Sequence, residues 1–150
     1  MVRKVILGLD IGWKRTGIAI SDASATFSFP RESIETKNRE DWYKQVKEIA
    51  KEEAVDEIVV GLPLNQDGEE GDDAKSIQGH IALLRERLKL PVIEWDERFT
   101  TLQAERTLLE ADLSREKRKK VIDKIAASII LQSYLDSLHF KRVLPPEDDE

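Results

Sequence analysis

The chain has 150 residues, of which 40% are hydrophobic and 36% charged, the balance of one globular domain large enough to bury a core. It contains no cysteine, which excludes disulfides and thiolate zinc sites, and it has no apolar run of about 18 residues that would span a membrane. The net charge is −6, but the last four residues are all acidic, which leaves −2 for the rest and keeps a nucleic-acid partner open.

The first segment, residues 5–22, is predicted to form a strand, a tight turn and a returning strand. It opens with an apolar run rich in branched residues, which is typical of a buried central strand. Asp10 stands where this run ends, and a carboxylate beside a core needs a partner or a metal. The turn that follows carries Lys14 and Arg15, which suggests phosphates nearby. The alternative is a plain hairpin in which Asp10 caps its own turn.

The next pattern predicts a third strand and then alternating helices and strands. Residues 25–29 alternate apolar and polar side chains up to Pro30, and residues 33–36 continue or complete this strand. Asn38 is a favoured N-cap for the first helix. The later elements are a strand at 57–61, a loop at 62–71, a helix marked by Ile77, Ile81, Leu84 and Leu88, a strand at 90–95, a short helix from Thr100 or Thr101 to about 111, and a long helix from Ser114 to about 138.

This order of elements predicts an α/β fold. Three strands joined by short turns form an antiparallel meander, and the two strands linked by helices should be parallel, with right-handed crossovers. We therefore predict a mixed five-stranded sheet, with three antiparallel strands plus two parallel ones, flanked by helices. Residues 1–142 are predicted to form one domain, and residues 143–150 an acidic tail without stable structure.

Three acidic residues from separated segments are candidates for a metal site. Asp10 and Glu97 follow the first and the last predicted strand, and open α/β sheets place their sites at strand ends. Asp123 falls on an apolar row of the long helix, where a carboxylate needs a partner. Together they would suit Mg²⁺ or Mn²⁺, and two such ions could activate a water for attack on a phosphodiester. The alternatives are a polar start of a loop for Glu97 and a buried salt bridge for Asp123.

Positive charges gather at the start of the long helix. The helix dipole disfavours cations there, so their placement favours a ligand role, although such runs more commonly form a solvated basic face. Trp13, beside the cations of the first turn, could stack on a base or cover the end of the sheet. The basic run consists of Arg115, Lys117, Arg118, Lys119 and Lys120.

Four short motifs, in this order and at these distances, resemble those of one family. The first comprises Asp10, Ile11 and Gly12 with Arg15, Gly17 and Ala19; the second residues 60–65 with Gly68 and Gly71; the third residues 96–101 with Ala104 and Glu105; and the last Lys117, Lys120, Asp123, Ala126, Ala127, Ile130, Leu131 and Gln132. They resemble the YqgF family, also known as RuvX-type Holliday junction resolvases, over about residues 4–140. The chain departs from the pattern at Asp72 and Asp73, where a less acidic helix start is expected.

The resemblance implies an RNase H-like fold, with Asp10, Glu97 and Asp123 as a catalytic, metal-binding triad, and a bacterial, cytoplasmic protein. Two functions are attached to the family: maturation of the 5′ end of pre-16S rRNA, which we favour, and resolution of branched DNA, which is the alternative. The residues expected to contact nucleic acid are Lys14, Arg15, Asn65, Arg98, Lys117, Arg118, Lys119 and Lys120.

Two other classes of protein stay open at this point. An actin-like ATP-binding domain also uses an Asp-x-Gly turn, but it generally needs two domains around the nucleotide, and this chain has room for one. A non-catalytic nucleic-acid-binding module is expected to have a damaged triad, whereas all three acids are present. As partners we expect structured RNA or branched DNA and no membrane, and a homodimer stays open. The N-terminus lacks the pattern of a signal peptide, which also indicates a cytoplasmic location.

Overall fold

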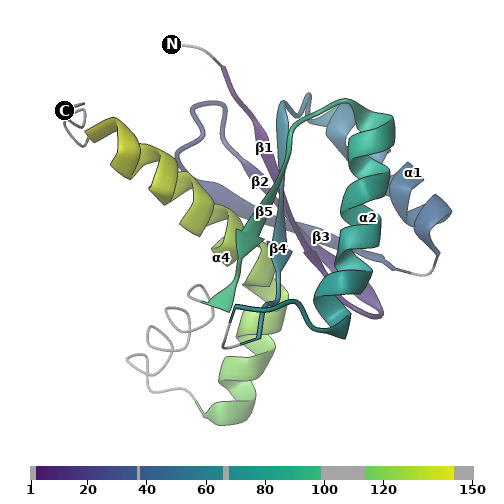
Figure 1. The fold of residues 1–150 in the computed structure, drawn as a ribbon. Helices are drawn as coiled ribbons and strands as arrows, with labels where there is room; N and C mark the ends of the chain where they lie inside the picture. The colour runs from purple at the N-terminus through teal and green to yellow at the C-terminus, as the bar shows by residue number, and fades with distance from the viewer. Residues whose placement is uncertain (1–2, 37, 66–67, 99–113, 144–150) are drawn as a thin grey trace, which may run out of the picture.

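A computed structural model of the protein describes residues 3–36, 38–65, 68–98 and 114–143, and of these the side chains of residues 119–124 and 141–143 are outside the description. The elements are β1 (Ile6–Ile11), β2 (Arg15–Ser21), β3 (Ser28–Glu35), α1 (Arg39–Glu52), β4 (Glu57–Leu62), α2 (Asp72–Leu88), β5 (Val92–Asp96) and α4 (Arg115–Val143) (Figure 1). The predicted helix that begins at Thr100 or Thr101, and residues 144–150 of the predicted tail, lie outside the described residues.

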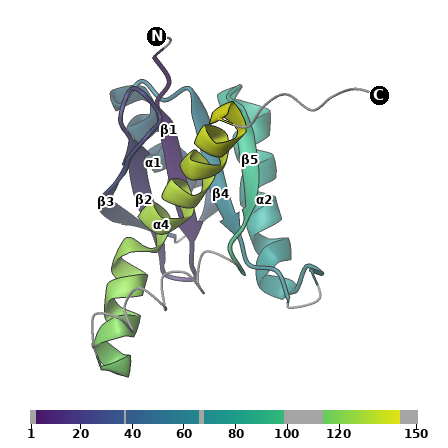
Figure 2. The same cartoon turned by 90° about the vertical axis from the view of Figure 1, so that its left-hand side faces the viewer.

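The strands form the mixed sheet that the sequence predicts. Their order is β3-β2-β1-β4-β5; β1 pairs with β2, and β2 with β3, in antiparallel fashion, while β4 is parallel to both β1 and β5. α1 and α2 cover one face of this sheet and α4 crosses the other (Figures 1 and 2). The carboxyl ends of β1, β4 and β5 therefore meet at one edge. Within the described parts of the chain, no helix is long and apolar enough to cross a membrane.

Alternation along β1 divides the core into two layers. Leu7 and Leu9 belong to the cluster packed under α1 and α2, whereas Ile6 belongs to the cluster under α4. Because successive side chains of a strand point to opposite faces, Asp10 points to the same face as Ile6 and Gly8. The apolar run that ends at Asp10 thus directs this carboxylate to the side of the sheet where α4 lies.

Several predicted boundaries agree with the structure, whereas the start of the third strand differs. Asn38 caps α1, its side chain accepting a hydrogen bond from the N–H of Asp41 at 2.8 Å. β3 begins at Ser28, later than the predicted residue 25, and runs through Pro30 to Glu35, so residues 33–35 continue this strand, one of the two predicted alternatives; Pro30 is tolerated because β3 is an edge strand of the described sheet. The residues before it form a turn, held by Asp22, whose Oδ1 accepts the N–H of Thr26 at 2.8 Å.

Candidate functional site

Asp10 lies at the carboxyl end of β1 and is half-buried. In the strand register it stands opposite Gly17 of β2. A Cβ atom built on Gly17 would lie 3.6 Å from the Cβ of Asp10 and 3.5 Å from the Cβ of Ala127 in α4. A larger side chain at position 17 would therefore occupy the space between Asp10 and the helix, and glycine leaves that space open.

Glu97 follows β5 directly, and its carboxylate lies against β4 at Gly61. The N–H of Glu97 donates to the carbonyl of Leu62 at 3.3 Å, so the pairing of β4 with β5 extends one residue beyond β5. A Cβ on Gly61 would come within 2.7 Å of Glu97 Oε2 and 2.6 Å of Ile130 Cδ1 in α4. Glycine is needed here for the carboxylate and the helix to share the surface of β4. The only sequence signal for this role was a glycine inside an apolar strand, which indicates a close approach.

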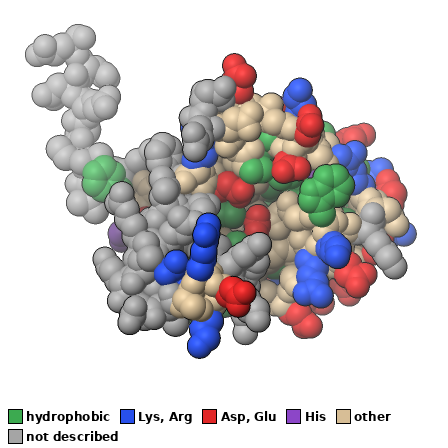
Figure 3. All heavy atoms as spheres, turned by 90° about the horizontal axis from the view of Figure 1, so that it is seen from below, with side chains coloured by type: hydrophobic (Ala, Val, Ile, Leu, Met, Phe, Trp, Pro, Cys, Tyr) green, Lys and Arg blue, Asp and Glu red, His purple; other side chains and the backbone are tan. Residues whose placement is uncertain are grey.

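The electrostatics of Glu97 show that the two acids lie near each other. Burial, and then the negative charges of Asp10 and Asp96, raise the pKa of Glu97 from 4.5 to about 7. The pKa of Asp96 is instead lowered, because it accepts hydrogen bonds from Arg98. Viewed onto this end of the sheet, several acidic side chains lie near the middle of the face, and both acidic and basic side chains surround them (Figure 3). Asp10 and Glu97 are thus brought together across 86 intervening positions, as the strand ends predict.

α4 packs directly on the sheet beside both acids. A Cβ on Gly8 would lie 2.8 Å from the Cβ of Leu131, so only glycine lets the helix approach β1 this closely. Ala127, which is buried, faces Gly17 from the helix. Asp123 belongs to α4 one helical turn before Ala127, on the same row of the helix, and its side chain is outside the described residues. Its convergence with the other two acids stays a prediction.

The two described acids suit a divalent cation. Carboxylate oxygens are the donors that Mg²⁺ and Mn²⁺ prefer, and a cation between two carboxylates offsets both the burial and the repulsion that hold the pKa of Glu97 high. Among the side chains that are described, no three His, Asp or Glu residues are grouped closely enough to hold a metal. A complete site therefore requires a further ligand, and Asp123 is the candidate that the sequence predicts.

The cations of the first turn lie at the same cavity as Asp10. Lys14 and Arg15 are exposed, and together with Asp10 and Gly17 they line a cavity of about 850 Å³. This arrangement places positive charge where a polyanion that reaches Asp10 would need it. The prediction that Lys14 and Arg15 contact phosphates is consistent with this placement and stays a prediction.

Arg98 forms an ion pair that the sequence did not indicate. Its Nη2 donates to Asp96 Oδ2 at 2.6 Å and its Nε to Asp96 Oδ1 at 3.0 Å. Its Nη1 also donates to the backbone carbonyl of Asn65, at 3.3 Å. Arg98 therefore holds the loop after β4 against the end of β5, while the side chain of Asn65 is exposed. Contacts of these two residues with nucleic acid stay predictions.

The basic run occupies the first turns of α4. Ser114, the predicted start of this helix, caps it by accepting a hydrogen bond at its Oγ from the N–H of Lys117 at 3.3 Å. Lys117 is exposed and Arg118 half-buried, whereas the side chains of Lys119 and Lys120 are outside the described residues. The run precedes Asp123 along the helix, as predicted, and its phosphate contacts stay predictions.

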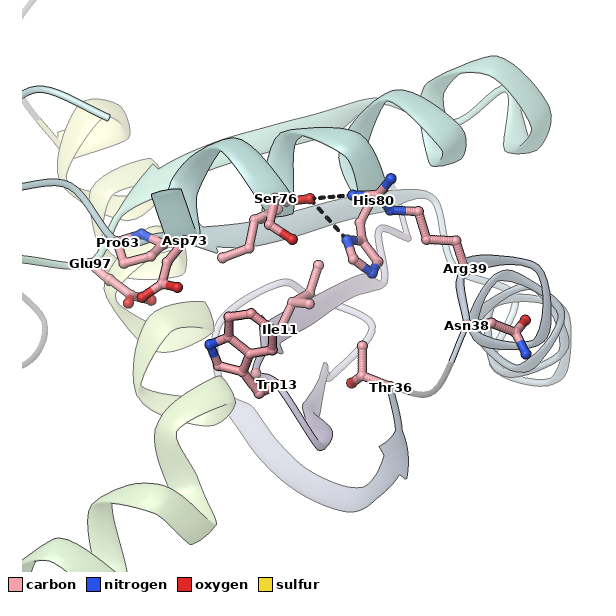
Figure 4. Close-up of a pocket in the computed structure, with 12 residues that line it drawn as sticks. Ile11, Trp13, Thr36, Asn38, Arg39, Pro63, Asp73, Ser76, His80 and Glu97 are labelled. Atoms are coloured by element: carbon pink, nitrogen blue, oxygen red, sulfur yellow. Dashed lines mark hydrogen bonds between the residues drawn. The ribbon is translucent and has the colours of Figure 1, made fainter. Parts of the chain in front are cut away.

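A second cavity, of about 530 Å³, is lined by the β1–β2 turn, the start of α1, α2 and Glu97 (Figure 4). His80 forms part of its wall. This histidine is buried and contacts Trp42 edge-on, with ring centroids 4.7 Å apart, and its Nδ1 lies 3.1 Å from the carbonyl of Ser76. Burial lowers the pKa of His80. His80 therefore belongs to the core and also forms part of the wall of this cavity.

Comparison with known proteins finds a matching protein family and similar sequences. A family model described as RuvX, Holliday junction resolvase, matches residues 4–137. A protein of Caldanaerobacter subterraneus named "Putative pre-16S rRNA nuclease" is 52% identical over 133 residues, which cover 88% of this chain and 96% of the relative. A protein of Listeria monocytogenes with the same name is 50% identical over 134 residues, covering 88% of this chain and 97% of the relative.

Two solved structures share the fold. RuvC of T. thermophilus in complex with a Holliday junction substrate superposes with a TM-score of 0.56 at 12% identity, covering 91% of this chain and 96% of that one. The fowlpox virus Holliday junction resolvase gives a TM-score of 0.51 at 20% identity, covering 89% and 99%. At these identities the likeness concerns the fold alone, and it confirms the predicted RNase H-like architecture.

Proposed function

Because the chain belongs to the RuvX family of Holliday junction resolvases, we propose that it is a metal-dependent nuclease that hydrolyses phosphodiester bonds of structured nucleic acid in the cytoplasm. The observation that carries the proposal is the meeting of Asp10 and Glu97 on the α4 face of the sheet, close enough for Asp10 to raise the pKa of Glu97. Asp123, one turn before Ala127 on α4, is proposed as the third acid.

In this proposal the three acids hold Mg²⁺ or Mn²⁺. When bound, such ions activate a water and stabilise the leaving oxygen of a phosphodiester. Gly61 lets Glu97 and Ile130 lie side by side on β4, and Gly17 places no side chain between Asp10 and Ala127. Lys14 and Arg15, from the hairpin turn, and the basic run from Lys117 to Lys120 bind flanking phosphates and so position the strand without reading its bases. The Asp96–Arg98 ion pair holds the backbone that carries Glu97.

The substrate we favour is the 5′ end of pre-16S rRNA. Relatives that are about half identical over nearly their whole length carry that name. The description of the family model supports the alternative, a four-way DNA junction. Both substrates are phosphodiester polyanions, and the proposed acids and cations suit either.

The experiment compares cleavage of a pre-16S rRNA fragment and of a four-way DNA junction by the purified full chain, in Mg²⁺ and in EDTA. Asp10→Asn, Glu97→Gln and Asp123→Asn remove one charge each and preserve shape. We expect each to lose more than the roughly 10- to 100-fold typical of residues that only support a metal ligand. Asp136→Asn is the matched control, because Asp136 is an exposed acid further along α4. Undiminished cleavage in EDTA, or full activity of Asp10→Asn, would refute the proposal.

A further inference from the structure

The β1–β2 turn carries a tryptophan that contributes almost nothing to the core. Trp13 is 86% exposed, whereas Trp42 is fully buried and Trp95 half-buried. Burying an indole is strongly favourable, so an exposed indole leaves a large apolar surface in water that a bound ligand could cover. Its position between Gly12 and the cation Lys14 places it at the edge of the sheet where Asp10 and Glu97 lie.

The turn that carries Trp13 is held in place by the backbone. Gly12 donates its N–H to the carbonyl of Arg15 at 3.0 Å, and a Cβ at position 12 would lie only 2.8 Å from that carbonyl oxygen. The carbonyl of Lys14 accepts the N–H of Thr36 at 2.9 Å, which ties the turn to the end of β3. The indole therefore projects from a fixed backbone, which lowers the entropy lost when a flat ligand binds to it.

The indole is a wall common to the two cavities described above. On one side it joins Lys14, Arg15 and Asp10 in lining the larger cavity. On the other side it lines the smaller cavity with Glu97, and Figure 4 shows it on the wall formed by the turn, with His80 on the wall formed by α2. Trp13 thus stands between the cations and the cavity that reaches the second acid.

The two cavities differ in what they can accept. Positive charge from Lys14 and Arg15 suits phosphates on the first side. On the second side most of the lining is apolar or uncharged, with Arg39, Asp73 and Glu97 as its charged residues, and the carboxylate of Asp73 can accept hydrogen bonds from the N–H groups of a base. A volume of about 530 Å³ is within the range of roughly 300–1,000 Å³ for sites of small organic groups. The smaller cavity is therefore suited to a flat ring that carries N–H donors.

We propose that Trp13 is a stacking platform for an unpaired nucleobase of the substrate, next to the phosphate bound at Asp10 and Glu97, and that the smaller cavity receives this base. The inference rests on the proposed nuclease function and adds a substrate requirement to it. A base inside a duplex has both faces stacked on its neighbours, so it meets the indole only where the strand is open. The protein then selects a nucleotide that is already unpaired beside the cleaved bond, and it does so with little regard to sequence, because every base offers a flat face.

The test is binding in EDTA, where cleavage is not needed for a readout. Fluorescence anisotropy is measured with a labelled single-stranded RNA and with the fully paired duplex of the same sequence. Trp13→Ala is expected to weaken single-strand binding by about tenfold, the effect of losing one base–aromatic stack. Trp13→Phe retains a flat ring and should recover most of this loss. Phe140→Ala is the matched control, because Phe140 is 65% exposed near the far end of α4 and should bind as the wild type does.

A second readout comes from the tryptophans themselves. Trp13 is the exposed one of the three, so stacking should quench the fluorescence of the wild type on titration with single-stranded RNA, and Trp13→Phe should remove most of the quenching. Equal binding by Trp13→Ala and wild type, or the same loss on single strand and duplex, would overturn the inference while leaving the nuclease proposal intact. Absence of binding to both RNAs by the wild type would count against both proposals, whereas binding without Mg²⁺-dependent cleavage would count against the nuclease proposal alone.

Discussion

Replacing Glu97 by Gln should change how stability depends on pH when no metal is present. The pKa of Glu97 is raised from 4.5 to about 7, chiefly by burial and then by Asp10 and Asp96. Between these two pH values the folded state holds a proton that the unfolded state has lost, so the stability of the wild type falls as pH rises from about 4.5 to about 7. Glutamine does not titrate, and the variant escapes this loss.

The size of the effect follows from the same shift. Each pKa unit corresponds to about 1.4 kcal/mol, which gives an upper limit of about 3 kcal/mol for this group. Because Glu97 keeps part of its surface in water, solvent screening reduces the effect, and we expect about 1–2 kcal/mol. In EDTA, Glu97→Gln should therefore gain this amount of stability relative to the wild type at pH 8, and little or nothing at pH 4.5.

Urea unfolding in EDTA at pH 4.5 and pH 8 measures this difference, with Asp136→Asn as the control for loss of an exposed acid. Adding Mg²⁺ at pH 8 should then stabilise the wild type and reverse the order of the two proteins, because a ligand that binds only the folded state raises its stability. A gain of the variant that is equal at both pH values would show that the change acts through packing. No gain at pH 8 would show that Glu97 is not held in a repulsive, buried environment.

Two further predictions concern the surroundings of the acids. Gly61→Ala should destabilise the fold by about 1–3 kcal/mol and abolish cleavage, since its Cβ would meet both Ile130 and Glu97. Adding Ile130→Val should restore the stability measured in urea but not the cleavage activity. Recovery of both stability and activity would contradict the role assigned to Gly61. The double variant Lys14→Ala/Arg15→Ala should flatten the slope of log affinity against log salt by about two. The control is Lys44→Ala/Lys47→Ala, which removes two exposed cations of α1. An unchanged slope in the Lys14→Ala/Arg15→Ala variant would exclude the phosphate contacts.

Much of the fold follows from local patterns in the sequence. The apolar run of β1 and the cap at Asn38 are properties of short segments, and both agree with the structure. Whether β3 runs through Pro30 could not be decided in the same way. Pro30 is compatible with a strand only because β3 lies at the edge of the sheet, and edge position is a property of the whole sheet.

Asp10 and Glu97 were predictable as candidates because open α/β sheets place their functional sites at the ends of strands. Asp10 ends the apolar run of the first strand and Glu97 follows the last strand, and the parallel order of β1, β4 and β5 brings these strand ends to one edge. The groups that make room for them were not predictable. Gly61 matters because the side chains of Ile130, from a helix far along the chain, and Glu97 both lie where its Cβ would be. Arg98 likewise donates a hydrogen bond to the carbonyl of Asn65, and the spacing of residues along the chain does not predict this contact between loops.

Taken together, the proposed contacts recognise features that RNA and DNA share. Carboxylates bind the metal that acts on a phosphodiester, cations bind phosphates, and Trp13 meets the flat face of a base. None of these interactions depends on the sugar or on base identity, so each serves a processed rRNA end and a branched DNA equally well. If Trp13 requires an unpaired nucleotide beside the cleaved bond, selectivity arises from which strand is open within reach of the acids. An rRNA end that is single-stranded at the cleavage point satisfies this requirement directly, whereas a fully paired junction must first unstack a base, at a cost of a few kcal/mol. On the proposal for Trp13, a substrate that is single-stranded at the cleavage point is therefore the better match to the site, whether it is RNA or DNA.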